Sequence, residues 1–315
     1  MVVAERLGII LQPKQGYAKF NAGMIREGET VHMLYRWAAS SRPQGEQFPI
    51  YSQDHVAYAR MDLKGNVLED TDETPFIKLP PNPDGSPVYT QDPRIVPFEG
   101  EYYLFYTVWN MKAARVGISR TKDFKTVEHI GIVPNGNWDK DAFILPERIK
   151  GKIAYVHRVE PEIQIDYFNS FSEMLDEAYW KDYSQIKDQR MVIRGEHVWE
   201  NQKVGGSVPP IETELGWLFI YHGVSNDRTP FCYRAGVAVL DRNNPSKVVY
   251  RLPYPILEPT EEYECRGDVP EVVFPQGVYL NGDHLYMSYG GADTIVAMCR
   301  YNYSNLINEL SKYPV

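Results

Sequence analysis

Cysteine is scarce in this sequence, and long apolar runs are missing from it. The 315 residues contain three cysteines, Cys232, Cys265 and Cys299, without a CxxC pair, so neither a disulfide framework nor a thiolate zinc site is indicated. No apolar run approaches the ~18 residues that a membrane-spanning helix needs. The first residues, MVVAERLGIILQPKQGY, lack the charged, then apolar, then small order of a signal peptide. We therefore expect a cytoplasmic protein.

Basic residues are fewer than acidic ones, and motifs for binding a cofactor are absent. Lysine plus arginine total 33 against 42 aspartate plus glutamate, a net charge of −9, which argues against a nucleic-acid partner. There is no GxxxxGK[ST] or GxGxxG loop to cradle a nucleotide, and no HExxH motif or His/Cys cluster for a catalytic metal. We expect no metal, no organic cofactor and no membrane partner. The 23 tyrosines suit sugar clefts and half-buried strands alike.

One pattern recurs five times along the chain: a glycine turn, a short aromatic and aliphatic strand, and then a polar residue. Its glycines are separated by 72, 51, 65 and 66 residues and are Gly28, Gly100, Gly151, Gly216 and Gly282. These spacings are close to or above the ~40–50 residues of a propeller blade. A second strand-like segment follows each copy, which predicts repeated antiparallel hairpins. The recurrence favours an all-β, five-bladed β-propeller over a pair of β-sandwiches.

The same pattern bears on domain organisation. Length alone suggests two domains, but all-β folds often carry such a length as one, and we predict a single propeller domain over residues 1–315. Helical periodicity is limited to an acidic and aromatic insertion near 170–187 and a short C-terminal segment at 304–312.

The predicted architecture directs the search for a site. We take the five repeated strands to be the inner strands of the blades, so residues at their equivalent ends should converge on the axial channel. The polar residues that close the repeats are Arg36, Asn110, Arg158, His222 and Asp293. Separately, each is a strand end that faces water. Together, they predict one polar pocket.

Asp92 is the first candidate for acid catalysis. It precedes the second repeated strand, where Pro93 disfavours helical geometry at residue 92, and Arg94 can bond the carboxylate or a substrate. The alternative is an ordinary Asp-Pro turn. Asp293 is the second candidate, and it follows small residues that let a ligand approach the backbone.

Four basic residues form a second constellation. They flank the third and fourth repeated strands and are Lys140, Arg158, Lys203 and His222. Placed at one rim, they would make an anion site, with arginine offering a planar fork and lysine a point charge. The alternative is four unrelated surface bases paired with the abundant acids.

Eight segments in order along the chain carry a resemblance to a known family. They are FNAGM (20–24), QDPRI (91–95), KDAFILPE (140–147), HR (157–158), KVGGSVPPI (203–211), YHG (221–223), DVPEVVFP (268–275) and YGGADT (289–294). As a set they resemble glycoside hydrolase family 130 over nearly the whole chain. The resemblance implies a five-bladed propeller and, as in most members, an inverting β-mannoside phosphorylase; a minority of members hydrolyse β-mannosides.

The resemblance also implies roles for individual residues. Asp92 matches the catalytic acid, which would protonate the leaving oxygen through the mannosyl 3-hydroxyl. The phosphate site matches Lys140, Arg158, Lys203 and His222, and the mannosyl subsite matches Asn21, Arg36 and Asp293. Arg94, beside the acid, and Asn110, at a strand end, are added as sugar-binding candidates from their positions. The chain departs from the common pattern at Gln91, Lys140 and Glu271, which bears on substrate preference.

Physical chemistry separates the two activities. An inverting hydrolase needs a second carboxylate to activate water, whereas phosphate is already anionic and needs cations to hold it. The four basic residues therefore favour phosphorolysis, with inorganic phosphate as co-substrate and α-mannose 1-phosphate as product. A β-mannosidase using Glu147, Glu200 or Glu271 as base, and a noncatalytic sugar-binding propeller, remain as alternatives.

The expected partners are phosphate and a β-linked manno-oligosaccharide or mannosyl disaccharide. The linkage, β-1,4 or β-1,2, stays open. Members of the family are often oligomers, although this sequence shows no interface signature.

Overall fold

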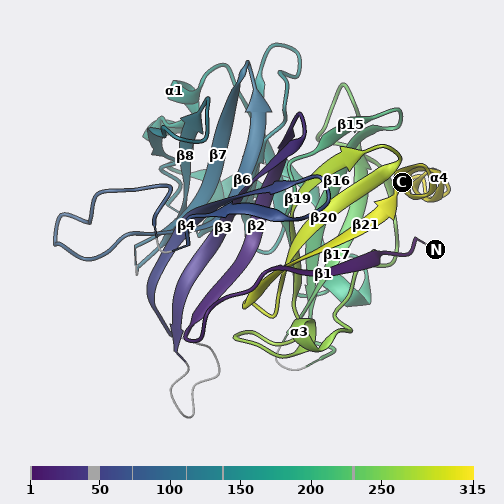
Figure 1. Ribbon diagram of the computed structural model, residues 1–315. Coiled ribbons are helices and arrows are strands. Elements are labelled where there is room, and N and C mark those ends of the chain that lie inside the picture. The colour runs from purple at the N-terminus through teal and green to yellow at the C-terminus, as the bar shows by residue number, and fades with distance from the viewer. Residues whose placement is uncertain (1, 42–49, 73, 111, 137, 229–230) are drawn as a thin grey trace.

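Five antiparallel sheets make up the molecule (Figure 1). The computed structural model describes residues 2–41, 50–72, 74–110, 112–136, 138–228 and 231–315. The first sheet consists of β2 (Tyr17–Glu27), β3 (Thr30–Ser41), β4 (Ile50–Asp62) and β5 (Val67–Asp70). The second consists of β6 (Tyr89–Phe98), β7 (Glu101–Trp109), β8 (Ala114–Thr121) and β9 (Glu128–Ile132).

The remaining sheets follow the same order. The third consists of β10 (Asp139–Ile144), β11 (Ile153–Val159), β12 (Ile163–Phe168) and β13 (Met191–Ile193). The fourth consists of β14 (Lys203–Gly206), β16 (Gly216–Ser225), β17 (Cys232–Leu240) and β18 (Val248–Arg251), with β15 (Ile211–Thr213) also paired to β16. The fifth consists of β19 (Val273–Asn281), β20 (His284–Gly291), β21 (Ile295–Asn302) and β1 (Glu5–Leu11).

The arrangement confirms the predicted five-bladed β-propeller and shows how it closes. Strand β1, from the start of the chain, pairs antiparallel with β21, with Glu5 opposite Arg300. The last blade is therefore built from both ends of the sequence. Such closure fastens the first and last blades without a further covalent link.

The repeated strands occupy a different place in the blade from the one expected. They are β3, β7, β11, β16 and β20, and each lies second in its sheet. The innermost strands are the segments before them, and β19, β2, β6, β10 and β14 contact one another in succession. The expectation that the repeated strands are innermost is therefore wrong by one strand. The polar strand ends still reach the axis, because neighbouring strands in a sheet lie only ~4.8 Å apart.

The blades pack face to face, which explains why the strands read as nearly continuous apolar runs. Between the first two sheets, Leu34 and Val56 pack with Ile95 and Leu104. Strand β16 is buried over its whole length. Burial on both faces removes the alternation of polar and apolar residues that would mark a strand with one wet face.

Short helices lie in the connections between the strands and at the end of the chain. Four lie between β12 and β13: α1 (Phe171–Met174), α2 (Glu177–Trp180), η1 (Tyr183–Gln185) and η2 (Lys187–Arg190). The others are η3 (Val198–Glu200), α3 (Glu262–Cys265) and the C-terminal α4 (Tyr303–Leu310). Within the described residues, no helix is both long and apolar enough to cross a membrane.

A buried ion network ties the helical insertion to the third blade. His157 is wholly buried between Asp139 and Asp166, each 2.9 Å away. Burial alone would lower the pKa of His157, but the two carboxylates raise it to about 9. Tyr183 of the insertion donates to Asp166 at 2.6 Å. Asp139 and His157 directly precede Lys140 and Arg158 along β10 and β11, so the network borders these two residues.

Candidate active site

The beginnings of the innermost strands surround a polar cavity of about 480 Å³. Eight of the ten residues singled out in the sequence line it: Asn21, Arg36, Asp92, Lys140, Arg158, Lys203, His222 and Asp293. Some come from the starts of innermost strands, as Lys203 does in β14, and others from the ends of second strands, as Arg158 does in β11. The fold thus brings together side chains from all five blades.

Three innermost strands turn a side chain into the cavity by means of a bulge. The pairings of β2 with β3, β6 with β7 and β10 with β11 each shift register once. At these points Asn21, Asp92 and Asp141 have φ values of 51°, 50° and 55°. Asn and Asp tolerate this left-handed region better than other residues with a side chain, and a bulge redirects the side chain that it carries.

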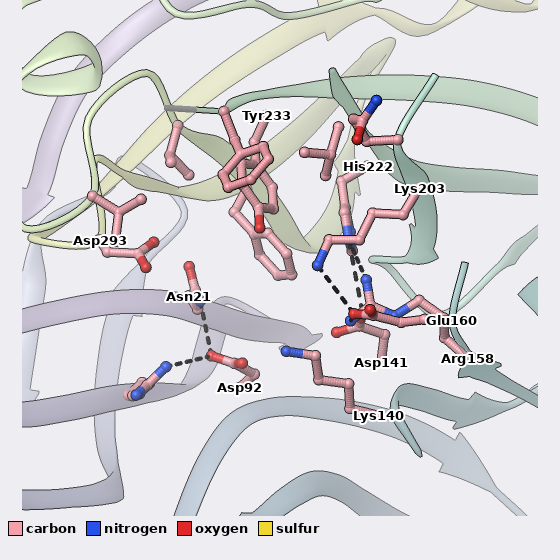
Figure 2. Close-up of a pocket in the computed structure, with 17 residues that line it drawn as sticks. Asn21, Asp92, Lys140, Asp141, Arg158, Glu160, Lys203, His222, Tyr233 and Asp293 are labelled. Carbon is pink, nitrogen blue, oxygen red and sulfur yellow. Dashed lines mark hydrogen bonds and ion pairs between the residues drawn. The ribbon is translucent and has the colours of Figure 1, made fainter. Parts of the chain in front are cut away.

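Asp92 lies on one side of the cavity with few partners (Figure 2). Asn21 donates from Nδ2 to Asp92 Oδ1 at 2.8 Å, and Arg36 Nη1 is 3.7 Å from the same oxygen. Arg36 is held in turn by Asp54, whose Oδ2 is 2.6 Å from Nη2. The second oxygen of Asp92 makes no hydrogen bond within the described part of the chain. That oxygen is therefore free to exchange a proton with a bound hydroxyl.

Asp293 faces the same side of the cavity. Burial raises its pKa to about 7, and Asp92 adds to the rise, while Arg36 opposes it. Near neutral pH the carboxyl is therefore close to half protonated, and it can donate to or accept from a sugar hydroxyl.

Three cations line the same cavity: Arg158 and Lys203 lie across it from Asp92, and Lys140 extends between them and Asp92 (Figure 2). Arg158 is 1% exposed; its Nε lies 3.1 Å from Asp141 Oδ2, and its Nη2 lies 3.2 Å from Glu160 Oε1. Lys203 donates to the same Glu160 oxygen at 3.0 Å. Lys140 makes neither a hydrogen bond nor an ion pair among the described residues; burial and the charge of Arg158 lower its pKa to about 8. Three cations against two carboxylates leave one net positive charge.

His222 contributes a neutral ring to this cluster. Burial lowers its pKa well below the usual range, and the charge of Arg158 adds to the effect although Asp141 opposes it. Arg158 Nη1 lies 3.4 Å from His222 Nε2 and can only donate, so Nε2 accepts. The ring proton is then on Nδ1, which donates to Ser207 Oγ at 2.9 Å. The expectation of four basic charges is corrected to three.

Arg94 and Asn110 lie outside the cavity lining. Arg94 is 1% exposed and donates to the backbone oxygens of Asp92, Gly206 and Ser207 at 2.9, 2.9 and 3.0 Å. It also pairs with Asp141 at 3.0 Å, so it links the second, third and fourth blades. Asn110 accepts the backbone N–H groups of the turn that follows it. Neither position supports the predicted direct contact with a sugar.

The sequence assigned no role in the site to several residues that the structure places there. Asp141 lines the cavity as a partner of Arg158, and Asp54 holds Arg36. The aromatic rings of Tyr233 and Phe274 also line the cavity. Asp141 and Phe274 carried a signal, since they lie in the KDAFILPE and DVPEVVFP segments.

The three glutamates considered as hydrolytic bases lie elsewhere. Glu147 is exposed, and Glu200 is wholly buried with Arg251 Nη2 2.6 Å from its Oε1. Glu271 pairs with Arg228 at 2.9 Å. None of the three lines the cavity.

The fold and the cavity define a five-bladed propeller enzyme with its site at the axis. The sequence profile of a family described as beta-1,4-mannooligosaccharide phosphorylase, glycoside hydrolase family 130, matches residues 9–312. The chain belongs to this family.

Two relatives agree with this assignment, and a solved structure agrees with the fold. A 1,2-beta-oligomannan phosphorylase of Thermoanaerobacter sp. (strain X514) is 32% identical over 92% of this chain and 93% of its own length. A beta-1,2-mannobiose phosphorylase of the same organism is 34% identical over 89% of each chain. The solved structure of beta-1,2-mannobiose phosphorylase from Listeria innocua, in complex with beta-1,2-mannobiose, superposes with a TM-score of 0.77 at 24% identity, over 98% of this chain and 99% of the other.

Proposed function

We propose that this protein is an inverting β-mannoside phosphorylase. It cleaves a β-mannosyl linkage of a manno-oligosaccharide with inorganic phosphate and releases α-mannose 1-phosphate. The observation that carries the proposal is the cluster of Lys140, Arg158 and Lys203 in the one cavity that Asp92 also lines. The family and its named phosphorylase relatives support the same reaction.

The proposed reaction uses the two sides of the cavity for different tasks. A phosphate oxygen attacks C1 of the mannosyl unit, the C1–O bond to the leaving sugar breaks, and configuration inverts from β to α. Asp92 supplies the proton for the leaving oxygen, passed through the mannosyl 3-hydroxyl. The cations hold phosphate and offset its charge as it approaches C1. The reaction needs no metal or organic cofactor.

The first prediction concerns the product. A panel of β-1,2- and β-1,4-linked manno-oligosaccharides, incubated with phosphate, should yield α-mannose 1-phosphate, identified by phosphorus NMR. Turnover should disappear in a phosphate-free buffer, because the two carboxylates beside the cations, Asp141 and Glu160, are held in ion pairs and not poised to activate water. Free mannose released at the same rate without phosphate would reject the proposal and favour a β-mannosidase. The panel also reports the linkage and the preferred chain length.

The second prediction concerns Lys140 and pH. Its pKa lies near 8, so raising the pH through 8 removes the ammonium charge that faces the cavity. Phosphate affinity should then fall, by up to tenfold per pH unit. Lys140→Arg should abolish this dependence, because arginine stays charged throughout the range. Comparing KM for phosphate between the two proteins at each pH cancels the titration of phosphate itself. Parallel profiles would exclude Lys140 from the phosphate site.

A further inference from the structure

Glu160 occupies the space between two of the cations proposed to bind phosphate. A single carboxylate oxygen, Oε1, lies 3.2 Å from Arg158 Nη2 and 3.0 Å from Lys203 Nζ. Figure 2 shows this carboxylate among the cation side chains. Burial would raise the pKa of Glu160, but the charges of Arg158 and Lys203 lower it below its usual value. Glu160 is therefore ionised at neutral pH.

Glu160 differs from Asp141, the other carboxylate of the cluster. The side chain of Asp141 is 2% exposed and lies between Arg158 and Arg94, whose nitrogens are 3.1 and 3.0 Å away. The Asp141 side chain therefore cannot rotate away from these two arginines into solvent. The side chain of Glu160 is 40% exposed and follows the last residue of β11 in a turn. It can rotate into water without disturbing the sheet.

We infer that Glu160 is the resident counter-ion of the phosphate site, which phosphate displaces when it binds. The inference rests on the proposed function. The oxygen of Glu160 stands where a phosphoryl oxygen would bridge the same two cations. When Glu160 turns out, the cluster gains one net positive charge next to Arg158 and Lys203, where an anionic phosphate can take its place.

The displacement of Glu160 by phosphate affects both the affinity for phosphate and the release of the phosphorylated product. A carboxylate beside bound phosphate would be a like-charge contact, which is costly in a cleft of low dielectric. Phosphate therefore competes with Glu160 for Arg158 and Lys203, and its affinity is lower than the cations alone would provide. The returning carboxylate also favours departure of the phosphorylated product. Glu160 thus sets the KM for phosphate.

The test compares Glu160→Gln with the control Glu162→Gln. Glu162 is two residues away and pairs with Lys187 at 3.6 Å, so the control removes the same charge outside the cavity. Glu160→Gln should tighten the Kd of inorganic phosphate, measured by calorimetry without sugar, by about five- to tenfold, a modest gain because the pair is partly screened by water. KM for phosphate should fall in parallel, and KM for the mannoside should stay constant. Glu162→Gln should remain within twofold of the wild type.

Other outcomes separate this inference from the proposed function. Unchanged or weaker phosphate binding in Glu160→Gln, and in the second variant Glu160→Ala, would show that Glu160 orients the cations instead of competing for them, and would overturn the inference. A wild-type protein that binds no phosphate and cleaves mannosides without it would overturn the proposed function itself. Loss of that phosphate-independent turnover in Glu160→Gln would then identify Glu160 as a base that activates water.

Discussion

Asp92→Asn should lose roughly 10²- to 10⁴-fold in kcat, the usual span for general acid catalysis. The substitution is nearly isosteric and removes only the proton donor. It should also fold normally, because residue 92 has a φ of 50° and asparagine adopts this region at least as readily as aspartate. Phosphorolysis of a mannoside with a poor leaving group, followed under saturating phosphate, measures the effect.

Two comparisons make this result specific. Circular dichroism and the melting temperature should match those of the wild type, since the amide can still accept the hydrogen bond from Asn21. A mannoside whose leaving group needs no protonation should recover much of the lost rate. Near-normal turnover of the poor substrate would show that Asp92 is only a turn residue.

Arg158→Ala should raise KM for phosphate by roughly 10- to 150-fold, the equivalent of one charge-assisted contact of about 1.5–3 kcal/mol. KM for the mannoside should change far less. In the synthetic direction, KM for α-mannose 1-phosphate should rise by a similar factor, because both ligands present the same phosphoryl oxygens. Steady-state kinetics in both directions measures these constants.

The same substitution should also lower the melting temperature. Arg158 is 1% exposed and pairs with Asp141 and Glu160, and breaking a buried pair leaves an uncompensated charge. Arg158→Gln, which keeps a donor near Asp141, should reduce that loss while phosphate binding stays weak. Arg120→Ala, which breaks an exposed pair with Glu128 at 2.9 Å, should change neither quantity much. A stability loss with an unchanged KM for phosphate would remove Arg158 from the site.

The fold was predictable because its signal is local and repeated. Each glycine turn and the strand after it report one hairpin, and five copies report five blades. The position of each strand in its blade was not predictable, since strands such as β16 are buried throughout and look alike from the sequence. The closure by β1 was also missed, because it joins residues almost 300 positions apart, Glu5 and Arg300.

The candidate site was only partly readable for similar reasons. Arg94 looked like a ligand because it stands beside Asp92, but its side chain turns beneath the site to reach backbone oxygens of the fourth blade. Gly205 showed no purpose in the sequence; in the structure a Cβ there would lie 2.4 Å from His222 Cε1. Gly205 is the partner of His222 in the antiparallel pairing of β14 with β16, and the close approach of the His222 ring to that backbone is a property of the packed molecule.

By itself, the sequence determined the class of fold, the family and most of the residues at the axis. Repeats and contiguous motifs consist of residues that are close together in the sequence, so they can be recognised without the structure. Only the tertiary structure decided the protonation states of the residues at the axis and their ion-pair partners. It made His222 neutral, lowered the pKa of Lys140, raised that of Asp293, and set Glu160 between two cations. These properties depend on burial and on neighbouring charges, some from the same blade and some from other blades, and the burial arises when the five sheets close around the axis.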